Sequence, residues 1–207
     1  MQKPKRISIT PANIDRDGIS VAQQTAGAAN LTITGALASG GAVTLGYAYA
    51  IEAYSAGNIS TVIFTVTGTD QWGNAQTDTI TGVSGGVVAT TKYFKTVTQI
   101  AASAAVGTDV EVGPADEIGY AYSLDGYETN TSIAVDISGT INFSVQKCFE
   151  RMTAGETPNW VAGGITTQTA DTQTAYTGPT AGVRLKVNSY SNGATIAMNV
   201  NQGRSGL

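Results

Sequence analysis

Hydrophobic and polar residues alternate along much of the chain with a period of two, which is typical of strands that bury one face. The alternation starts at Leu31 and is clearest over 43–49 and 62–66. Residues 61–69 lead through a short polar stretch into 75–81, and we interpret the two runs as a hairpin with a loop of four or five residues. This hairpin places Trp72 at an exposed tip.

Further strands are predicted at 87–91, 93–100, 110–112 and 118–122, with Gly-Gly, Gly-Thr-Asp and Gly-Pro-Ala-Asp turns between them. The segment 123–130 is the best candidate for a boundary between two halves of the chain. We expect it to be a loop, because it is too short for a linker.

Two hairpins are predicted in the second half. A three-residue loop at 138–140 would pair residue 137 with 141 and residue 135 with 143, and so place apolar residues on one face. A two-residue turn at Asn192-Gly193 would pair Val187 with Met198 and Leu185 with Val200. The opposite face, toward solvent or another subunit, would carry Arg184, Lys186, Asn188, Tyr190, Asn199 and Asn201.

These patterns predict an all-β protein, an antiparallel β-sandwich that is either jelly-roll-like or made of two packed β-subdomains. Residues 1–28 are expected to form an extended N-terminal arm, 29–123 a first β half and 124–207 a second. A Thr-, Gln- and Gly-rich stretch at about 150–180 reads as a long insertion that contacts a partner, with Trp160 exposed in it.

Composition agrees with a folded β protein, because only 13% of residues are charged, 42% are hydrophobic and 25 are Gly. The net charge is −4, so nucleic-acid binding by the body of the protein is not expected. Lys3, Lys5 and Arg6 make the N-terminus basic. They form either a solvated terminus, which we favour, or a contact with an acidic partner, and with Trp72 and Trp160 they are the candidate partner contacts.

The sequence contains few of the residues that catalysis commonly uses. The chain contains no histidine, so Ser-His-Asp and Cys-His arrangements and imidazole metal ligands are absent. The single cysteine, Cys148, is expected to be buried. Asp116, Glu117 and Asp136 could in principle hydrolyse a glycan, but nothing distinguishes them from solvated acids. We therefore expect no enzyme, no cofactor and no metal site; the run Asp15-Arg16-Asp17-Gly18 lacks the further ligands of a calcium loop.

Neither a signal peptide nor a segment long enough to span a membrane is recognisable. We expect synthesis in a cytoplasm without export and no membrane partner. A Thr- and Gly-rich β chain of this kind suggests a protein that assembles inside a cell and leaves it by lysis.

Four runs carry a resemblance to structural proteins of tailed bacteriophages: FTVTGTDQWGNAQTDTITG (64–82), ATTKYFKTVTQIAASAAVGTDVEVG (89–113), ISGTINFSVQKCFERM (137–152) and GPTAGVRLKVNSYSNGATIAMNVNQG (178–203). The resemblance implies a virion protein made in the host cytoplasm, either a capsid decoration or cement protein or a head-tail accessory component. Its partners would be the major capsid protein or other virion proteins, and we expect a homo-oligomer, a trimer or dimer. A tail- or fibre-associated protein that binds carbohydrate or a receptor is the alternative.

Overall fold

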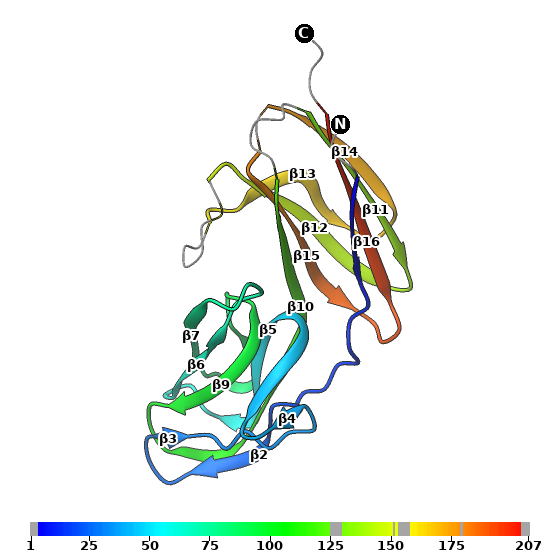
Figure 1. Cartoon of the computed structure of the whole chain (residues 1–207). Helices are drawn as coiled ribbons and strands as arrows, with labels where there is room; N and C mark the ends of the chain where they lie inside the picture. The colour runs from blue at the N-terminus through cyan, green and yellow to red at the C-terminus, as the bar shows by residue number, and fades with distance from the viewer. Residues whose placement is uncertain (1–3, 125–129, 151, 153–157, 179, 204–207) are drawn as a thin grey trace. The chain divides into compact units, whose positions relative to one another are not determined.

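A computed structural model describes residues 4–124, 130–150, 152, 158–178 and 180–203. All the regular structure in these residues is β, in antiparallel sheets, which confirms the predicted fold class (Figure 1). No helix among them is long and apolar enough to cross a membrane. The chain divides into two compact units: unit 1 comprises residues 1–13 and 117–207, and unit 2 comprises residues 14–116.

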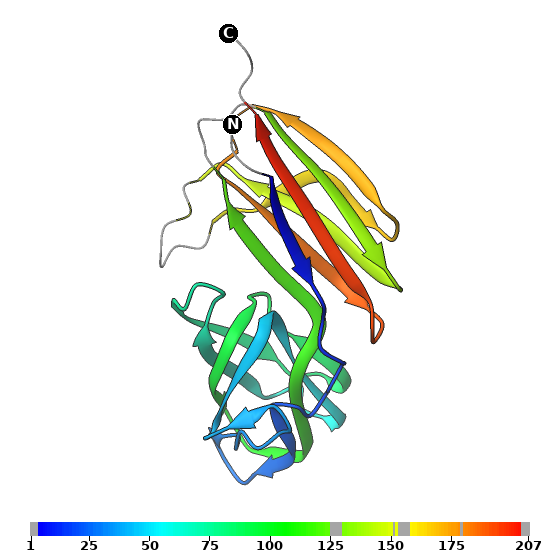
Figure 2. The same cartoon turned by 45° about the vertical axis from the view of Figure 1, so that its right-hand side comes forward.

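Unit 1 is a sandwich of two four-stranded sheets (Figure 2). One sheet has the order β1-β16-β11-β14, and the other has the order β13-β12-β15-β10. When the eight strands are numbered in chain order, these sheets read 1-8-3-6 and 5-4-7-2, which is the jelly-roll arrangement of two interlocked Greek keys. The strands are β1 (Lys5–Ile9), β10 (Val106–Ser123), β11 (Asn130–Ser138), β12 (Ile141–Cys148), β13 (Val161–Gln168), β14 (Thr172–Thr177), β15 (Gly182–Tyr190) and β16 (Thr195–Gly203).

The jelly roll overturns both hairpins predicted in the second half. β11 pairs with β14 and β16, and β12 pairs with β13 and β15, so the 138–140 connection crosses from one sheet to the other. The Asn192-Gly193 turn likewise joins β15 in one sheet to β16 in the other. The two corners lie together, because the Ser191 amide donates to the Thr140 carbonyl at 2.9 Å.

The predicted buried faces are nevertheless right, because strands that face each other across a sandwich point the same residues inward as strands of a hairpin do. The sandwich core is formed by residues with at most 3% exposure, among them Ile9, Ile133, Val135, Ile141, Phe143, Val145, Val183, Leu185, Val187, Met198 and Val200.

The N-terminal arm predicted at 1–28 is wrong for the described residues. β1 pairs with β16 from Lys5↔Val200 to Ile9↔Ile196, which makes it the edge strand of a jelly-roll sheet. Ile7 and Ile9 are buried in the core, and this burial holds the segment on the sandwich. Residues 20–25 belong to unit 2.

The insertion predicted at about 150–180 is also wrong where the structure describes it, because β13 and β14 are integral strands of the two jelly-roll sheets. The pair Gly163-Gly164 lies inside β13. There the pairing with β12 shifts from Val145↔Ile165 to Gln146↔Ala162, so the two glycines form a bulge.

Unit 2 is a curved sheet with the order β2-β10-β5-β9-β6-β7. The 17-residue β5 is long enough to pair with β9 along its first half and with β8 along its second. The two-residue strands β3 and β4 add to β9 and β5. The bounds are β2 (Ser20–Thr25), β3 (Ala29–Asn30), β4 (Ala38–Ser39), β5 (Ala42–Asn58), β6 (Ile63–Thr69), β7 (Ala75–Thr81), β8 (Ser84–Ala89) and β9 (Phe94–Ala102).

β10 replaces the two strands predicted at 110–112 and 118–122, and it runs through both units. The turn predicted at Gly113–Asp116 does not form. Pro114 lies between the segment of β10 that pairs with β2, which ends at Val112, and the segment that pairs with β15, which begins at Ile118. A proline is tolerated there because its missing N–H removes no hydrogen bond from the pairing with β2 or from the pairing with β15. The division between the units therefore falls at 116/117 within a strand, and not in the predicted loop at 123/124.

Candidate interaction surfaces

The tip of the β6–β7 hairpin displays Trp72, as predicted. The strands pair in register down to Thr69↔Ala75, and Trp72 is 50% exposed in the loop between them. The Asp70 carboxylate accepts hydrogen bonds from the Trp72 amide at 2.8 Å and the Asn74 amide at 2.9 Å. Gly73 supplies the left-handed turn with φ of 87°. The loop is therefore a closed, hydrogen-bonded turn that holds a large aromatic side chain outward.

Trp160, the second tryptophan candidate, is half-buried in unit 1 and already has a stacking partner. The Arg184 guanidinium carbon lies 4.8 Å from its ring centroid. Arg184 in turn donates from Nε to Gln146 Oε1 at 2.8 Å, across the β12–β15 pair. Because its ring is covered by the guanidinium, Trp160 offers less free aromatic surface than Trp72 does.

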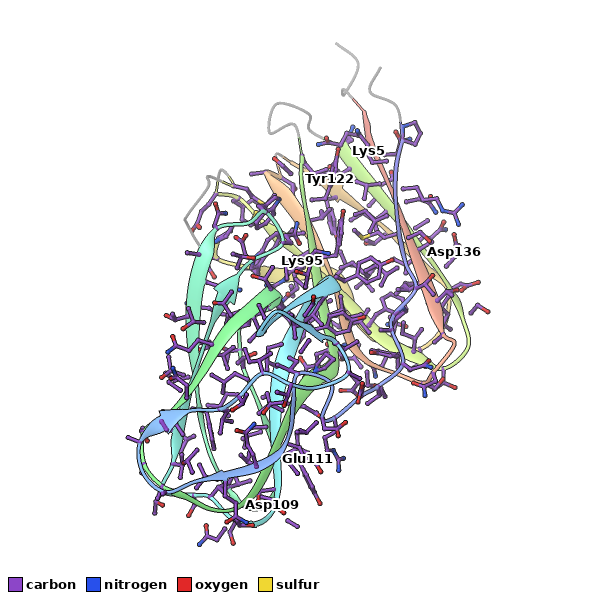
Figure 3. The ribbon with its side chains drawn as sticks, turned by 60° about the horizontal axis from the view of Figure 1, so that its bottom comes forward. Lys5, Lys95, Asp109, Glu111, Tyr122 and Asp136 are labelled. Atoms are coloured by element: carbon purple, nitrogen blue, oxygen red, sulfur yellow. The ribbon has the colours of Figure 1, made fainter. Side chains whose placement is uncertain are left out.

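The basic N-terminal residues separate in the structure. Lys3 lies outside the described residues, and Lys5 and Arg6 are exposed on β1. The Lys5 amine lies 5.7 Å from the ring centroid of Tyr122 in β10, at one end of the sandwich (Figure 3). Arg6 points to the opposite side of the sheet, away from the core. Pro4, Lys5 and Arg6 also discourage another chain from pairing with the free edge of β1.

The outward side of the sheet β1-β16-β11-β14 is a broad, weakly charged surface, which we call the outer face. Cross-strand register aligns its residues in rows: Arg6, Asn199, Ala134 and Gln173 form one row across the four strands. A shallow depression of about 430 Å³ opens on it, with Asn199, Asn201 and Gln173 as its longer polar side chains. Its other lining residues are Pro4, Ser132, Ile133, Ala134, Thr174, Ala175 and Val200.

The polar face that the sequence predicted for the last two strands is split between the two sheets. Asn199 and Asn201 lie on the outer face, whereas Arg184, Lys186 and Asn188 lie on the outward side of the other sheet. The Asn188 amide there donates to Asn142 Oδ1 at 2.8 Å, and Lys186 pairs with Glu117 at 3.5 Å.

Tyr190, which the sequence placed among these polar residues, is buried. Its hydroxyl donates to the Ala12 carbonyl at 3.0 Å, and the residue is 7% exposed.

Two buried hydroxyls lie opposite each other on β11 and β14. Thr131 pairs with Tyr176 in the ladder, and among the described residues neither Thr131 Oγ1 nor Tyr176 OH has a hydrogen-bond partner. Burial raises the pKa of Tyr176 to about 12. The Lys147 amine lies 4.8 Å from the Tyr176 ring centroid. A Cβ at Gly163 would come within 2.9 Å of the Tyr176 hydroxyl, so the β13 bulge makes room for this side chain.

The three acidic residues considered for glycan hydrolysis, Asp116, Glu117 and Asp136, have different neighbours in the structure. Asp116 and Glu117 are neighbours in one strand, so their side chains point to opposite faces. Glu117 forms the ion pair with Lys186, and Asp136 accepts a hydrogen bond from the Asn199 amide at 3.2 Å. Glu117 and Asp136 thus face outward from different sheets of unit 1 and do not converge on one substrate.

The Asp15–Gly18 loop is anchored within unit 2 by Arg16. Its guanidinium carbon lies 4.1 Å from the Tyr54 ring centroid, and its Nε lies 3.8 Å from Glu52 Oε1. Burial raises the pKa of Glu52, and the Arg16 charge partly offsets this rise. No group of three or more acidic or cysteine side chains suited to a metal ion occurs among the described residues.

Cys148 is fully buried, as expected from its place in a strand. Burial, with a contribution from the Glu150 carboxylate, raises the pKa of its thiol to about 11. A thiol with this pKa is almost entirely protonated at neutral pH and is a poor nucleophile.

Comparisons with known proteins give no family. No protein-family model matches the chain, and no curated protein matches it. A solved structure titled "Structure of infectious bursal disease virus Gx strain" aligns with 98% of this chain and 72% of that one, at 15% identity and a TM-score of 0.18. A similarity this low supports no assignment.

Sequence reasoning missed the outer face as a unit. Its residues come from four separated segments, and the only local signal was the polar alternation at Asn199 and Asn201. The pairing of the strands had to be known before these segments could be placed side by side.

Proposed function

We propose that this chain is a non-enzymatic structural protein of a bacteriophage particle, a decoration or cement protein that binds and stabilises the shell. The observation that carries the proposal is the jelly roll of unit 1, with unit 2 inserted into the connection between its first two strands. Jelly rolls serve in viral capsids, and also in lectins and cupins, so the fold alone does not select the function.

Further support comes from the chemistry of the surfaces. The chain has no histidine, its cysteine is buried, and its broad outer face is built mainly from amides, hydroxyls and small residues, with few charges. Such surfaces suit contacts with other proteins better than catalysis. The partners proposed are the major capsid protein or other virion proteins, and the location proposed is the virion.

The test is quantitative proteomics of purified particles, combined with deletion of the gene. We expect stoichiometric copies on the particle, and we expect particles without the protein to release DNA at a lower temperature. Adding back the purified protein should restore the release temperature, with serum albumin at equal concentration as the control. Absence of the protein from particles, or particles of unchanged stability after its loss, would count against the cement role.

Trp72 favours a second candidate, carbohydrate or receptor binding at a tail or fibre. A rigidly held, half-exposed tryptophan is suited to stacking on a sugar ring. A glycan array tests this idea with Trp72→Ala and the control Ile63→Ala, which truncates a 44% exposed side chain elsewhere on the same hairpin. Binding that is lost only with Trp72→Ala supports it, and an array without signal rejects it.

A further inference from the structure

The outer face has three central rows whose residues are fixed by register. On β16 the outward residues include Asn201, Asn199 and Ala197, and their neighbours on β11 are Ser132, Ala134 and Asp136. Arg6 on β1, Asp136 on β11 and Asp171 next to β14 are the only charged residues in these rows. In full, the rows are Asn201-Ser132-Ala175, Arg6-Asn199-Ala134-Gln173 and Ser8-Ala197-Asp136, and Pro4 and Asp171 follow at the ends of the first and third rows, one residue beyond the paired parts of β1 and β14.

Neighbouring outward residues on β16 and β11 differ in the size of their side chains. β16 presents two amide side chains, Asn199 and Asn201, whereas their neighbours on β11 are the small Ala134 and Ser132. Ala175 extends the low region onto β14, and the depression of about 430 Å³ lies over these residues. In these two rows β16 therefore stands higher than β11, whereas in the third row the order is reversed, because Ala197 on β16 lies beside Asp136 on β11.

We propose that the outer face is a two-fold interface with a second copy of this chain. The two-fold axis would run parallel to the strands, midway between β16 and β11, so that β16 lies over β11 of the second copy and β1 lies over its β14. Asn199 then fits above Ala134 of the second copy and Asn201 above its Ser132. Asp136 likewise fits above Ala197 of the second copy, so in each of the three rows the larger residue of the β16–β11 pair lies over the smaller one of the other copy.

The charged residues Arg6 and Asp171 also favour a two-fold axis parallel to the strands. Under this axis Arg6 lies over Gln173 of the second copy, one row from its Asp171. Rows on one face are about 6.7 Å apart and packed sheets are about 10 Å apart. Extended arginine and aspartate side chains together span this separation, so two equivalent Arg6–Asp171 ion pairs form at the margins. A two-fold axis perpendicular to the strands would instead place β16 over β16 of the second copy, so that the Asn199 and Asn201 side chains of the two copies would meet each other.

The size of the face predicts a moderate affinity. The two inner strands have five outward residues each and the two edge strands about three each; at about 4.8 Å by 6.7 Å for each residue, they give roughly 500 Å² per copy, or about 1,000 Å² in total. This area is at the low end for a specific interface, and the residues are polar, so we expect a dissociation constant on the order of micromolar. A decoration protein is expected to be a homo-oligomer, and this dimer names the interface that its copies would share. The inference rests on the proposed function to that extent.

Sedimentation velocity of the full chain, from about one tenth to one hundred times that dissociation constant, tests the proposal. The wild type should shift from monomer to dimer with concentration. Ala134→Arg places a long charged side chain near the axis and should weaken dimerisation at least about tenfold. The matched control is Thr81→Arg, at an exposed strand position in unit 2, and it should leave the association unchanged.

A double-mutant cycle keeps the test valid if Ala134→Arg disturbs the fold. Arg6→Gln and Asp171→Asn should each weaken the dimer by about threefold to tenfold, and the double variant should be no weaker than either single variant. Asparagine at 171 keeps a side-chain oxygen for the Ile137 amide, which now donates to Asp171 at 2.8 Å.

A wild type that stays monomeric, or a dimer in which the two substitutions act independently, would overturn the interface. The outcome is separable from that of the proposed function, because copies on the particle are counted independently. A monomeric protein found on particles removes only the dimer, whereas a dimer absent from particles removes only the virion role.

Discussion

Asp78, a half-buried acid on β7, should stabilise unit 2 strongly, and its removal gives a sharp test of the structure. Its Oδ2 accepts hydrogen bonds from the Thr91 amide at 2.7 Å, the Lys92 amide at 2.9 Å and the Thr91 hydroxyl at 3.0 Å. Its Oδ1 accepts from the Thr79 amide at 2.9 Å. One carboxylate thus attaches the segment between β8 and β9 to the edge strand β7.

The magnitude follows from these bonds. A hydrogen bond to a charged group contributes about 1.5–3 kcal/mol, but the bonds share one carboxylate at the protein surface, so their contributions do not add. We expect Asp78→Ala to lower the free energy of unfolding of unit 2 by about 2 kcal/mol. The matched control Asp109→Ala removes an exposed carboxylate that accepts a hydrogen bond from the Gln24 side-chain amide at 2.9 Å, and it should cost less than about 1 kcal/mol.

The stabilisation by Asp78 should depend on pH, in a direction set by the shift of its pKa. Burial alone would raise the pKa of Asp78, but the hydrogen bonds from Lys92, Thr79 and Thr91 prevail and lower it. The stabilisation is therefore fully present above the unfolded pKa of about 3.9 and is lost as the pH falls through the lower folded pKa. Urea denaturation at several pH values, with hydrogen exchange at the 91 and 92 amides, measures both effects. Unchanged exchange at these amides in Asp78→Ala would refute the reasoning.

Three further substitutions or reactions test unit 1 and the hairpin tip. Gly163→Ala should destabilise unit 1 by about 1–3 kcal/mol in urea denaturation, because its Cβ would lie 2.6 Å from the Val145 carbonyl oxygen; Gly203→Ala, with open space around it, is the control. Cys148 should resist a thiol reagent at pH 8 until the protein is unfolded, since burial raises the pKa of its thiol to about 11; rapid labelling of the native protein would contradict its burial. Trp72→Ala should change the free energy of unfolding by less than about 0.5 kcal/mol, and a larger loss would mean that the ring packs on the body.

Strand positions and buried faces were predictable from the sequence because they depend on local alternation. Ile133, Val135, Phe143 and Val145 are buried as the pattern requires. The strand partners were not predictable, because a turn signal specifies only that the chain reverses. The Asn192-Gly193 turn reverses the chain equally well between strands of one sheet and between the two sheets of a sandwich.

The pairing of the N-terminal strand β1 with β16 could not be predicted from the sequence either. β1 pairs with a strand almost 190 residues later in the chain, and no local feature of residues 5–9 indicates such a partner. The entropy of closing a loop grows only slowly with its length, so the whole of unit 2 can be inserted between β1 and the second half of β10. An edge strand with a short apolar pattern and a free arm look alike in sequence.

The outer face and the core of unit 1 follow from one set of registers. On β16, Met198 and Val200 point into the sandwich, while the alternate residues Asn199 and Asn201 point outward. A slip of one residue would exchange the two sets and place amides in the core, so core packing fixes the arrangement of the face. The face can therefore be altered at Ala134 without touching the side chains that stabilise the fold. For this reason the association of two copies can be measured separately from the stability of each.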